Sequence, residues 1–168
     1  GRFGLLLILF FVAVALLAPW IAPFSPANNQ WLSEVRPGVY PGPSAEHWLG
    51  IDTQGRDVLS RLIYACRIAL TVAFAASILA CILGTALGLL AGYFGGWADL
   101  VISRLIDIWM AFPPVLLSIL LVAVLGSGLH SVIAAIVVID WTRFARVVRA
   151  ETQQQARLEY AEAAVALG

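Results

Sequence analysis

Long apolar runs separated by short polar segments are the dominant pattern in this chain. The runs lie at about residues 3–22, 68–94, 105–125 and 129–148, and charged residues enter the second half of the last. Each has about the 20 residues with which an α-helix crosses a bilayer, or more. Pro113-Pro114 is expected to kink the third run. The pattern predicts an all-α integral membrane protein, a polytopic helical bundle with about four membrane helices.

The polar segments divide the chain into three parts. We expect a first transmembrane helix in residues 1–24, an extracytoplasmic loop in residues 25–56 and a membrane core in residues 57–168. The first apolar run is longer than the ~7–15 residues of a signal-peptide core, so a cleavable signal is the minor alternative. Trp31 and Trp48 in the loop are expected at the membrane interface, which amphipathic rings favour.

A short interfacial helix is predicted just before the second span, over Gly55–Arg67. The side chain of Asp52 or Thr53 can cap the start of such a helix. Asp57 and Arg61 stand four residues apart, and this spacing brings opposite charges together on a helix.

Small side chains recur at every fourth position of the second span. One row is Ala69, Ala73, Ser77, Cys81 and Thr85, and the other is Ala76, Ala80, Gly84, Gly88 and Gly92. Small residues let helix backbones approach closely in lipid, where no hydrophobic force pairs helices. One such motif can occur by chance in a Gly-rich helix, but two parallel rows favour a buried helix contact at Gly84, Gly88 and Gly92.

Charged side chains in the fourth run raise a functional question. Asp140 lies in this run. Because a carboxylate at membrane depth is energetically unfavourable, such a residue is by default a candidate functional residue. Its expected partner is Arg143 or Arg104, and a structural ion pair is favoured over a substrate contact. Arg146 and Arg149 are interpreted as snorkelling arginines at a membrane exit.

Composition narrows the class of function. Hydrophobic residues make up 61% and charged residues 12% of the chain, whereas soluble domains carry about 25% charged residues. The formal net charge is zero, so no basic surface suggests a nucleic acid. Every basic residue is Arg. Because a Walker A loop needs Lys to bind phosphate, these residues cannot hydrolyse ATP through that motif. Cys66 and Cys81 lie about 22 Å apart along one helix, too far to pair, and are interpreted as packing residues.

The distribution of arginines predicts the orientation. With the N-terminus inside and four spans, the arginines inside are Arg2, Arg104, Arg143, Arg146, Arg149 and Arg157, and those outside are Arg36, Arg56, Arg61 and Arg67. The excess inside agrees with the positive-inside rule. The loop is therefore expected outside and the segment after the fourth span in the cytoplasm.

One polar segment resembles a known family. Residues 47–61 resemble the GTDxxGRDxxSR signature of the peptide/nickel importer permeases, in the form typical of the dipeptide/oligopeptide C-type subunit. The matching residues are Asp52, Gly55, Arg56, Asp57 and Arg61. Further similar stretches lie at 91–97, 104–113 and 141–149, while Ile51, Ala65-Cys66 and Asp140 depart from the family pattern.

The last residues carry a second resemblance. Glu162-Ala163-Ala164 followed by Gly168 is similar to the EAA loop of ATP-binding-cassette importer permeases. In that family the loop is a short cytoplasmic helix that docks into a separate ATPase subunit. The resemblance gives as coupling residues Glu159, Tyr160, Glu162, Ala163, Ala164 and Gly168. An ordinary amphipathic connector is the alternative.

The resemblance implies a non-catalytic permease subunit of the type I importer kind, in the cytoplasmic membrane of a bacterium or archaeon. Such a chain binds no cofactor, and ATP is hydrolysed on two partner ATPase subunits. A homologous permease subunit, an extracytoplasmic solute-binding protein and the lipid bilayer are the other partners, and no nucleic acid is expected. The family has two more spans after the loop, so the chain is expected to be truncated at its C-terminus. Dipeptide, oligopeptide, nickel and other small solutes stay open as substrates.

Functions from other classes fit less well. A secondary transporter would also have kinked spans and an intramembrane carboxylate, but it needs inverted repeats, and these spans show none. A structural membrane subunit explains neither the signature nor the EAA-type loop. No nucleophile–base pair supports an intramembrane enzyme. Co-purification with an ATPase subunit is the observation that separates these functions.

Overall fold

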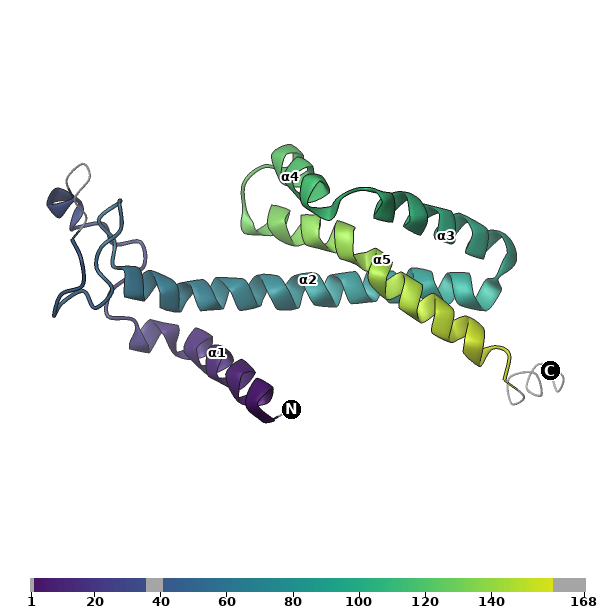
Figure 1. The fold of residues 1–168 in the computed structure, drawn as a ribbon, viewed down its shortest axis with the longest axis horizontal. Helices are drawn as coiled ribbons and strands as arrows, with labels where there is room; N and C mark the ends of the chain where they lie inside the picture. Colours follow the sequence, from purple (N-terminus) through teal and green to yellow (C-terminus); the bar gives the residue numbers. More distant parts are fainter. Residues whose placement is uncertain (1, 36–40, 159–168) are drawn as a thin grey trace. The chain divides into compact units, whose positions relative to one another are not determined.

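The computed structural model describes residues 2–35 and 41–158 (Figure 1). Apart from one isolated bridge between Ile51 and Asp57, its regular elements are helices. They are α1 (Arg2–Ile21), the 3-10 turn η1 (Leu32–Glu34), α2 (Val58–Phe94), α3 (Gly96–Ala111), α4 (Pro114–Leu125) and α5 (Leu129–Gln155). The predicted all-α class is therefore confirmed for the described part of the chain.

The chain divides into two compact units. The first, Gly1–Thr71, contains α1, the loop and the beginning of α2. The second, Val72–Gly168, contains the remainder of α2 together with α3, α4 and α5. Within the first unit, α1 and the start of α2 line a wholly apolar groove of about 630 Å³.

Helix α2 is one continuous helix of 37 residues. The helix predicted over Gly55–Arg67 begins three residues later, at Val58, and is continuous with the second span as far as Phe94. Its position at a membrane interface stays a prediction. No proline interrupts this stretch, so nothing removes a helical hydrogen bond. At 1.5 Å per residue the helix is about 55 Å long, well beyond the hydrocarbon thickness of a bilayer. Cys66 and Cys81 both lie in α2 and are free.

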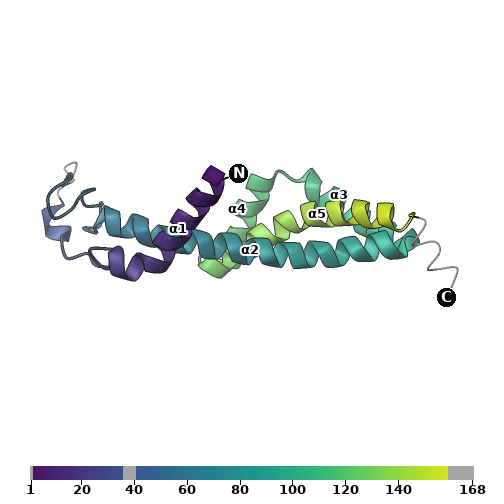
Figure 2. The ribbon, with the colours of Figure 1, turned by 90° about the horizontal axis from the view of Figure 1, so that it is seen from below.

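The third predicted span is a sharply bent pair of helices. α3 begins at Gly96, earlier than the expected Leu105, and α4 departs from it at an angle of 92° (Figure 2). Phe112 and Pro113 have extended backbone between the two helices. Pro114 opens α4, where its missing N–H costs no hydrogen bond. The predicted kink is therefore a full change of direction.

By length and composition, the described residues contain two helices able to span a membrane, α1 and α2, or three if the bent α3–α4 pair forms one span. Helix α5 is not among them. The first 18 residues of α5 include three charged side chains, Asp140, Arg143 and Arg146, and these lower its mean hydropathy. The predicted fourth span therefore stays a prediction.

In the second unit, α5 lies between α2 and the bent pair (Figure 1). Its closest contact is with the buried glycines of α2. A Cβ at Gly88 would lie 2.7 Å from the carbonyl oxygen of Ala145, and one at Gly92 would lie 2.6 Å from Cβ of Thr152. A Cβ at Gly84 would overlap the carbonyl oxygen of Trp141.

Helix α5 also packs on α3, next to its contact with α2. Ile106, Trp141 and Ala145 form a buried apolar cluster, flanked by Leu87, Ile102 and Trp109. The Trp109 indole also donates a hydrogen bond from Nε1 to the backbone oxygen of Val138 at 2.6 Å. Helix α5 is thus held by backbone contact with α2 and by apolar and aromatic packing with α3.

We expect Gly88→Leu to prevent normal folding of the second unit. A leucine must displace the α5 backbone, and overpacking of this kind costs about 1–3 kcal/mol or more. Abundance in membranes and monodispersity in detergent measure the effect. Gly4→Leu is the matched control, because a Cβ at Gly4 meets nothing within 4 Å. If Gly88→Leu behaves like this control, the contact between α2 and α5 is not required.

Candidate functional site

The signature residues fold into a turn held by one carboxylate. Asp52 Oδ1 accepts the backbone N–H groups of Gln54 at 2.8 Å and Arg56 at 3.0 Å. Asp52 Oδ2 accepts Arg56 Nε at 3.0 Å and also a short hydrogen bond from Arg61 Nη1. Gly55 has φ +70°, and a Cβ there would lie 2.5 Å from Cα of Leu32. Only glycine fits this position, because the conformation and the space both exclude a side chain.

The next carboxylate caps α2 and anchors a buried cluster. Asp57 Oδ2 accepts the backbone N–H of Ser60 at 2.7 Å, and Asp57 Oδ1 lies 3.1 Å from Nδ1 of His47. Ser60 Oγ in turn accepts the backbone N–H of Phe24 at 3.0 Å. The rings of His47, Trp31 and Phe24 contact one another, with centroid distances of 4.5 Å for His47–Trp31, 5.3 Å for His47–Phe24 and 4.7 Å for Phe24–Trp31. We call Phe24, Trp31, His47, Asp57 and Ser60 the loop cluster.

Three expectations for this region are wrong. Asp57, rather than Asp52 or Thr53, caps α2, because its side chain accepts the Ser60 amide. Arg61 bonds to Asp52 and not to Asp57, whose oxygens are already taken by the helix and by His47. Trp31 is buried in the loop cluster instead of lying at an interface.

Trp48 behaves differently from Trp31 and is 72% exposed. It lies in the turn closed by the hydrogen bond from Gly50 N to His47 O at 3.0 Å. An interfacial position for Trp48 stays a prediction.

The hydrogen bonds of the loop cluster favour the charged form of Asp57. Burial raises the pKa of this carboxyl, but the bonds from Ser60 and His47 outweigh burial, and the pKa falls below the ordinary value of 3.8. The resulting contribution to loop stability is present above the ordinary pKa. It is lost as pH falls through the lowered pKa, where the folded carboxylate takes up a proton.

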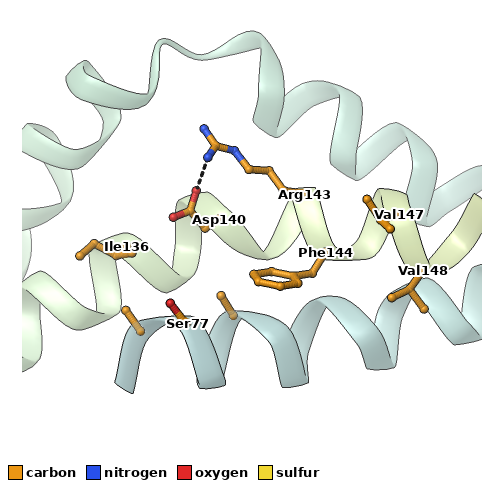
Figure 3. A pocket seen from close by; sticks show the side chains of 9 residues that line it. Ser77, Ile136, Asp140, Arg143, Phe144, Val147 and Val148 are labelled. Carbon is orange, nitrogen blue, oxygen red and sulfur yellow. Dashed lines mark ion pairs between the residues drawn. The ribbon is translucent and has the colours of Figure 1, made fainter. Parts of the chain in front are cut away.

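A groove of about 430 Å³ runs between α2 and α5 in the second unit (Figure 3). It is lined by Ala76, Ser77, Ala80, Ile136, Asp140, Arg143, Phe144, Val147 and Val148. Figure 3 shows Phe144 and Val148 directed from α5 toward α2, whereas Arg143 extends away from α2. The groove is therefore largely apolar, and its charged residues lie toward one side.

Asp140 is paired with the first of its two expected partners. Arg143 Nη1 lies 3.4 Å from Asp140 Oδ1, one helical turn further along α5. The two side chains are 69% and 34% exposed, for Arg143 and Asp140 respectively. Arg143 also lines a small cavity of about 60 Å³ beside Phe112 and Pro114 at the α3–α4 break.

The arginines beyond Arg143 are also paired. Arg146 Nη2 lies 3.8 Å from Asp107 Oδ1, with both side chains more than half exposed. Arg149 forms a two-pronged ion pair with Asp99 of α3. The interpretation of Arg149 as a snorkelling side chain is therefore wrong, since its guanidinium joins two helices.

The predicted coupling residues lie outside the described residues. α5 ends at Gln155 and the description of the chain ends at residue 158. The affected residues are Glu159, Tyr160, Glu162, Ala163, Ala164 and Gly168. Their role as a coupling loop stays a prediction.

Two family models match the chain. One is described as a binding-protein-dependent transport system inner membrane component and matches residues 84–168. The other, described as the N-terminal TM domain of oligopeptide transport permease C, matches residues 1–36.

Curated proteins resemble the chain over almost its whole length. The dipeptide transport system permease protein DppC of Alkalihalophilus pseudofirmus is 41% identical over 165 residues, which are 98% of this chain and 53% of that protein. The glutathione transport system permease protein GsiD of Pectobacterium atrosepticum is 39% identical over 163 residues, with 97% and 53% covered. GsiD of an Escherichia coli strain is also 39% identical, with 97% and 52% covered. The chain spans about half the length of the curated relatives it matches.

We expect Asp57→Ala to loosen the loop cluster. The change removes the cap of α2. It leaves His47 Nδ1 and the backbone N–H of Ser60 without their hydrogen-bond partner, which lowers folding stability by about 1–3 kcal/mol. Hydrogen exchange of the amides in residues 47–61 should become faster. Glu46→Ala removes an exposed carboxylate from the same loop and should leave exchange unchanged. Equal exchange in the two variants would mean that the cluster does not stabilise the loop.

Proposed function

Because this chain belongs to the family of binding-protein-dependent transport system inner membrane components, we propose that it is the permease subunit of an ATP-binding-cassette importer. The observation that carries this proposal is the similarity over 98% of the chain to a dipeptide transport system permease protein. The match of residues 1–36 to the N-terminal domain of oligopeptide permease C supports the C-type subunit in particular.

The importer is proposed to move short peptides or related small solutes. The names of the two kinds of relatives refer to dipeptide and to glutathione transport, and both solutes are small molecules with peptide bonds. The groove between α2 and α5 has few polar groups with which to select a solute. Selection by an extracytoplasmic solute-binding protein is consistent with that lining.

Energy is proposed to come from other subunits. The chain contains no lysine, and phosphate binding by a Walker A loop requires one. Two ATPase subunits would hydrolyse ATP, and a homologous permease subunit would form the other half of the path. In this arrangement the chain contributes an element with two alternative conformations rather than chemistry.

Coupling is proposed to enter through residues 159–168. These residues follow α5, and α5 contacts α2, α3 and α4 within the second unit. A displacement at the end of α5 therefore reaches each helix of that unit directly. A short Ala-rich helix with Gly168 at its end suits docking into a groove.

The location follows from the same proposal. Residues 25–56 lie outside a bacterial or archaeal cytoplasmic membrane, and the segment that begins at Arg149 lies inside. This orientation agrees with the arginine excess on the inner side. It requires α5 to cross the membrane, with its charged half toward the cytoplasm.

A secondary transporter, or a structural subunit without ATPase coupling, is the alternative. Either would explain the apolar helices and the exposed Asp140–Arg143 pair. Neither would retain an ATPase subunit during purification from membranes, whereas the proposed importer would.

Substitutions in the coupling segment test the proposal in cells that carry the full-length permease. We expect Gly168→Leu and Glu162→Lys to abolish or strongly reduce ATP-dependent peptide uptake at normal membrane abundance. A side chain at Gly168 enlarges the helix end, and charge reversal at Glu162 disturbs a docked contact. Uptake, abundance and ATPase co-purification are measured in parallel.

Glu46→Lys is the matched control, since it reverses an exposed charge in the loop on the opposite side. It should leave uptake unchanged. If both coupling variants retain uptake and bound ATPase, residues 159–168 are a connector and the coupling proposal is wrong.

Cysteine labelling checks the orientation. With Cys66 and Cys81 replaced, we expect a cysteine at Asn29 to react with an impermeant maleimide in intact cells. A cysteine at Gln154 should react only after the membrane is permeabilised. Both positions are exposed, so access is decided by the side of the membrane. The reverse labelling pattern would contradict the orientation.

A further inference from the structure

Asp99 in the first turn of α3 accepts more hydrogen bonds than any other carboxylate among the described residues of the second unit. Its Oδ1 accepts Arg149 Nε, and its Oδ2 accepts Arg149 Nη2 at 2.8 Å. Gln153 Nε2 donates to Oδ2 at 3.2 Å, and Ser103 Oγ donates to Oδ1 at 3.3 Å. Two of these donors come from α5 and lie about fifty residues away in sequence. We call Asp99, Ser103, Arg149 and Gln153 the carboxylate knot.

The knot coincides with the place where α2 and α5 touch. A Cβ at Gly88 would lie 3.1 Å from the Arg149 backbone nitrogen, and one at Gly92 would lie 3.0 Å from the Arg149 backbone oxygen. The backbone of Arg149 thus packs against α2, and its side chain binds Asp99 of α3. Three helices are joined at one residue.

The position of the knot along the chain gives it a role. α5 ends at Gln155, two residues after Gln153, and the proposed coupling segment begins at residue 159. Counting back along α5 from its C-terminal end, the hydrogen bonds of Gln153 and Arg149 to Asp99 are the first contacts with α3. A two-pronged guanidinium–carboxylate pair restrains rotation as well as distance, because its two hydrogen bonds are parallel.

Two other ion pairs of α5 provide a comparison. Asp140–Arg143 is a single contact at 3.4 Å within α5, and Arg146–Asp107 is a single contact at 3.8 Å. The members of both are more exposed than Asp99 and Arg149, whose side chains are 23% and 29% exposed. The loose pairs cannot hold α3 to α5 at a fixed angle.

We propose that Asp99 and Arg149 are positioning residues that make α3 and the end of α5 move as one body when the proposed coupling segment is displaced. The proposal rests on the function proposed above. Movement of the coupling segment is then delivered to α3 and, through the 92° break, to α4. Without the knot, the last turns of α5 move alone and ATP hydrolysis proceeds without transport.

The first experiment measures this rigidity without requiring transport. Spin labels are placed at the exposed positions Leu100 and Gln154 of the assembled transporter, after Cys66 and Cys81 are replaced. We expect one narrow distance distribution, with and without ATP, in the otherwise unchanged protein. Asp99→Asn and Arg149→Gln should broaden it, while Asp107→Asn, which affects a loose pair, should not. Narrow distributions in all variants would overturn the proposal.

The second experiment measures coupling in vesicles that contain the purified transporter, its binding protein and a labelled dipeptide. We expect Asp99→Asn and Arg149→Gln to reduce dipeptide transported per ATP hydrolysed by about fivefold, a common size for allosteric coupling. Subunit composition should be unchanged. The double variant Asp99→Arg with Arg149→Asp should recover part of the ratio, because it restores an ion pair. A purely structural role predicts lower abundance at an unchanged ratio, and that result would overturn the proposal.

The two experiments separate the two levels of inference. If the unchanged transporter retains no ATPase and takes up no dipeptide, the proposed function fails, and the label distances still decide whether the knot holds α3 to α5. If uptake is normal and the ratio is unaffected by both single variants, the proposed function stands and the positioning role is wrong.

Discussion

The second unit depends on the close approach of two backbones. Gly84, Gly88 and Gly92 give α2 a face without side chains, and the carbonyl groups of α5 lie where side chains would otherwise be. Lipid supplies no hydrophobic force to pair helices, so contact area and close packing must supply it. With α5 placed directly against α2, Trp141 and Ala145 of α5 also meet Ile106 of α3, and Leu87 of α2 flanks the same cluster. The glycine row therefore fixes which residues of α5 pack against α2.

In the loop, the main constraint is that polar side chains are buried at the start of α2. Asp57 is 2% exposed, Ser60 0% and His47 5%, and each is hydrogen bonded within the loop cluster. Among the described side chains, no buried nitrogen or oxygen lacks a partner. A buried network in which every group is satisfied specifies one conformation, whereas a partly satisfied one costs stability. Asp52, Gly55 and Asp57 of the signature thus each have a role in the local fold of the loop.

Sequence periodicity shows which residues share one face of a helix, but it does not show which residues they contact. The glycine row repeats every four residues, so its shared face was visible before the partner was known, and the motifs of the loop pointed to the family. Arg61 illustrates the limit, because its spacing to Asp57 was right for a pair, but the capping role of Asp57 left Asp52 as the better partner. Asp99 and Arg149 are fifty residues apart, and nothing in a local pattern joins them. The sharp bend at Pro113 was visible as a break, but its angle depends on packing against α5.

The charged side of α5 restricts what can surround it. Asp140 is 34% and Arg143 69% exposed, although the part of α5 before Asp140 contains no Asp, Glu, Lys or Arg. Charged groups facing hydrocarbon are strongly unfavourable, and such residues in membrane proteins face other protein or a water-filled cavity. The side of α5 that bears Asp140, Arg143 and Arg146 must therefore face protein or water when the chain is in a membrane, whereas the exposed apolar side chains of α1 and α4 can face lipid. This requirement is electrostatic and follows from the placement of α5 against the glycine face of α2.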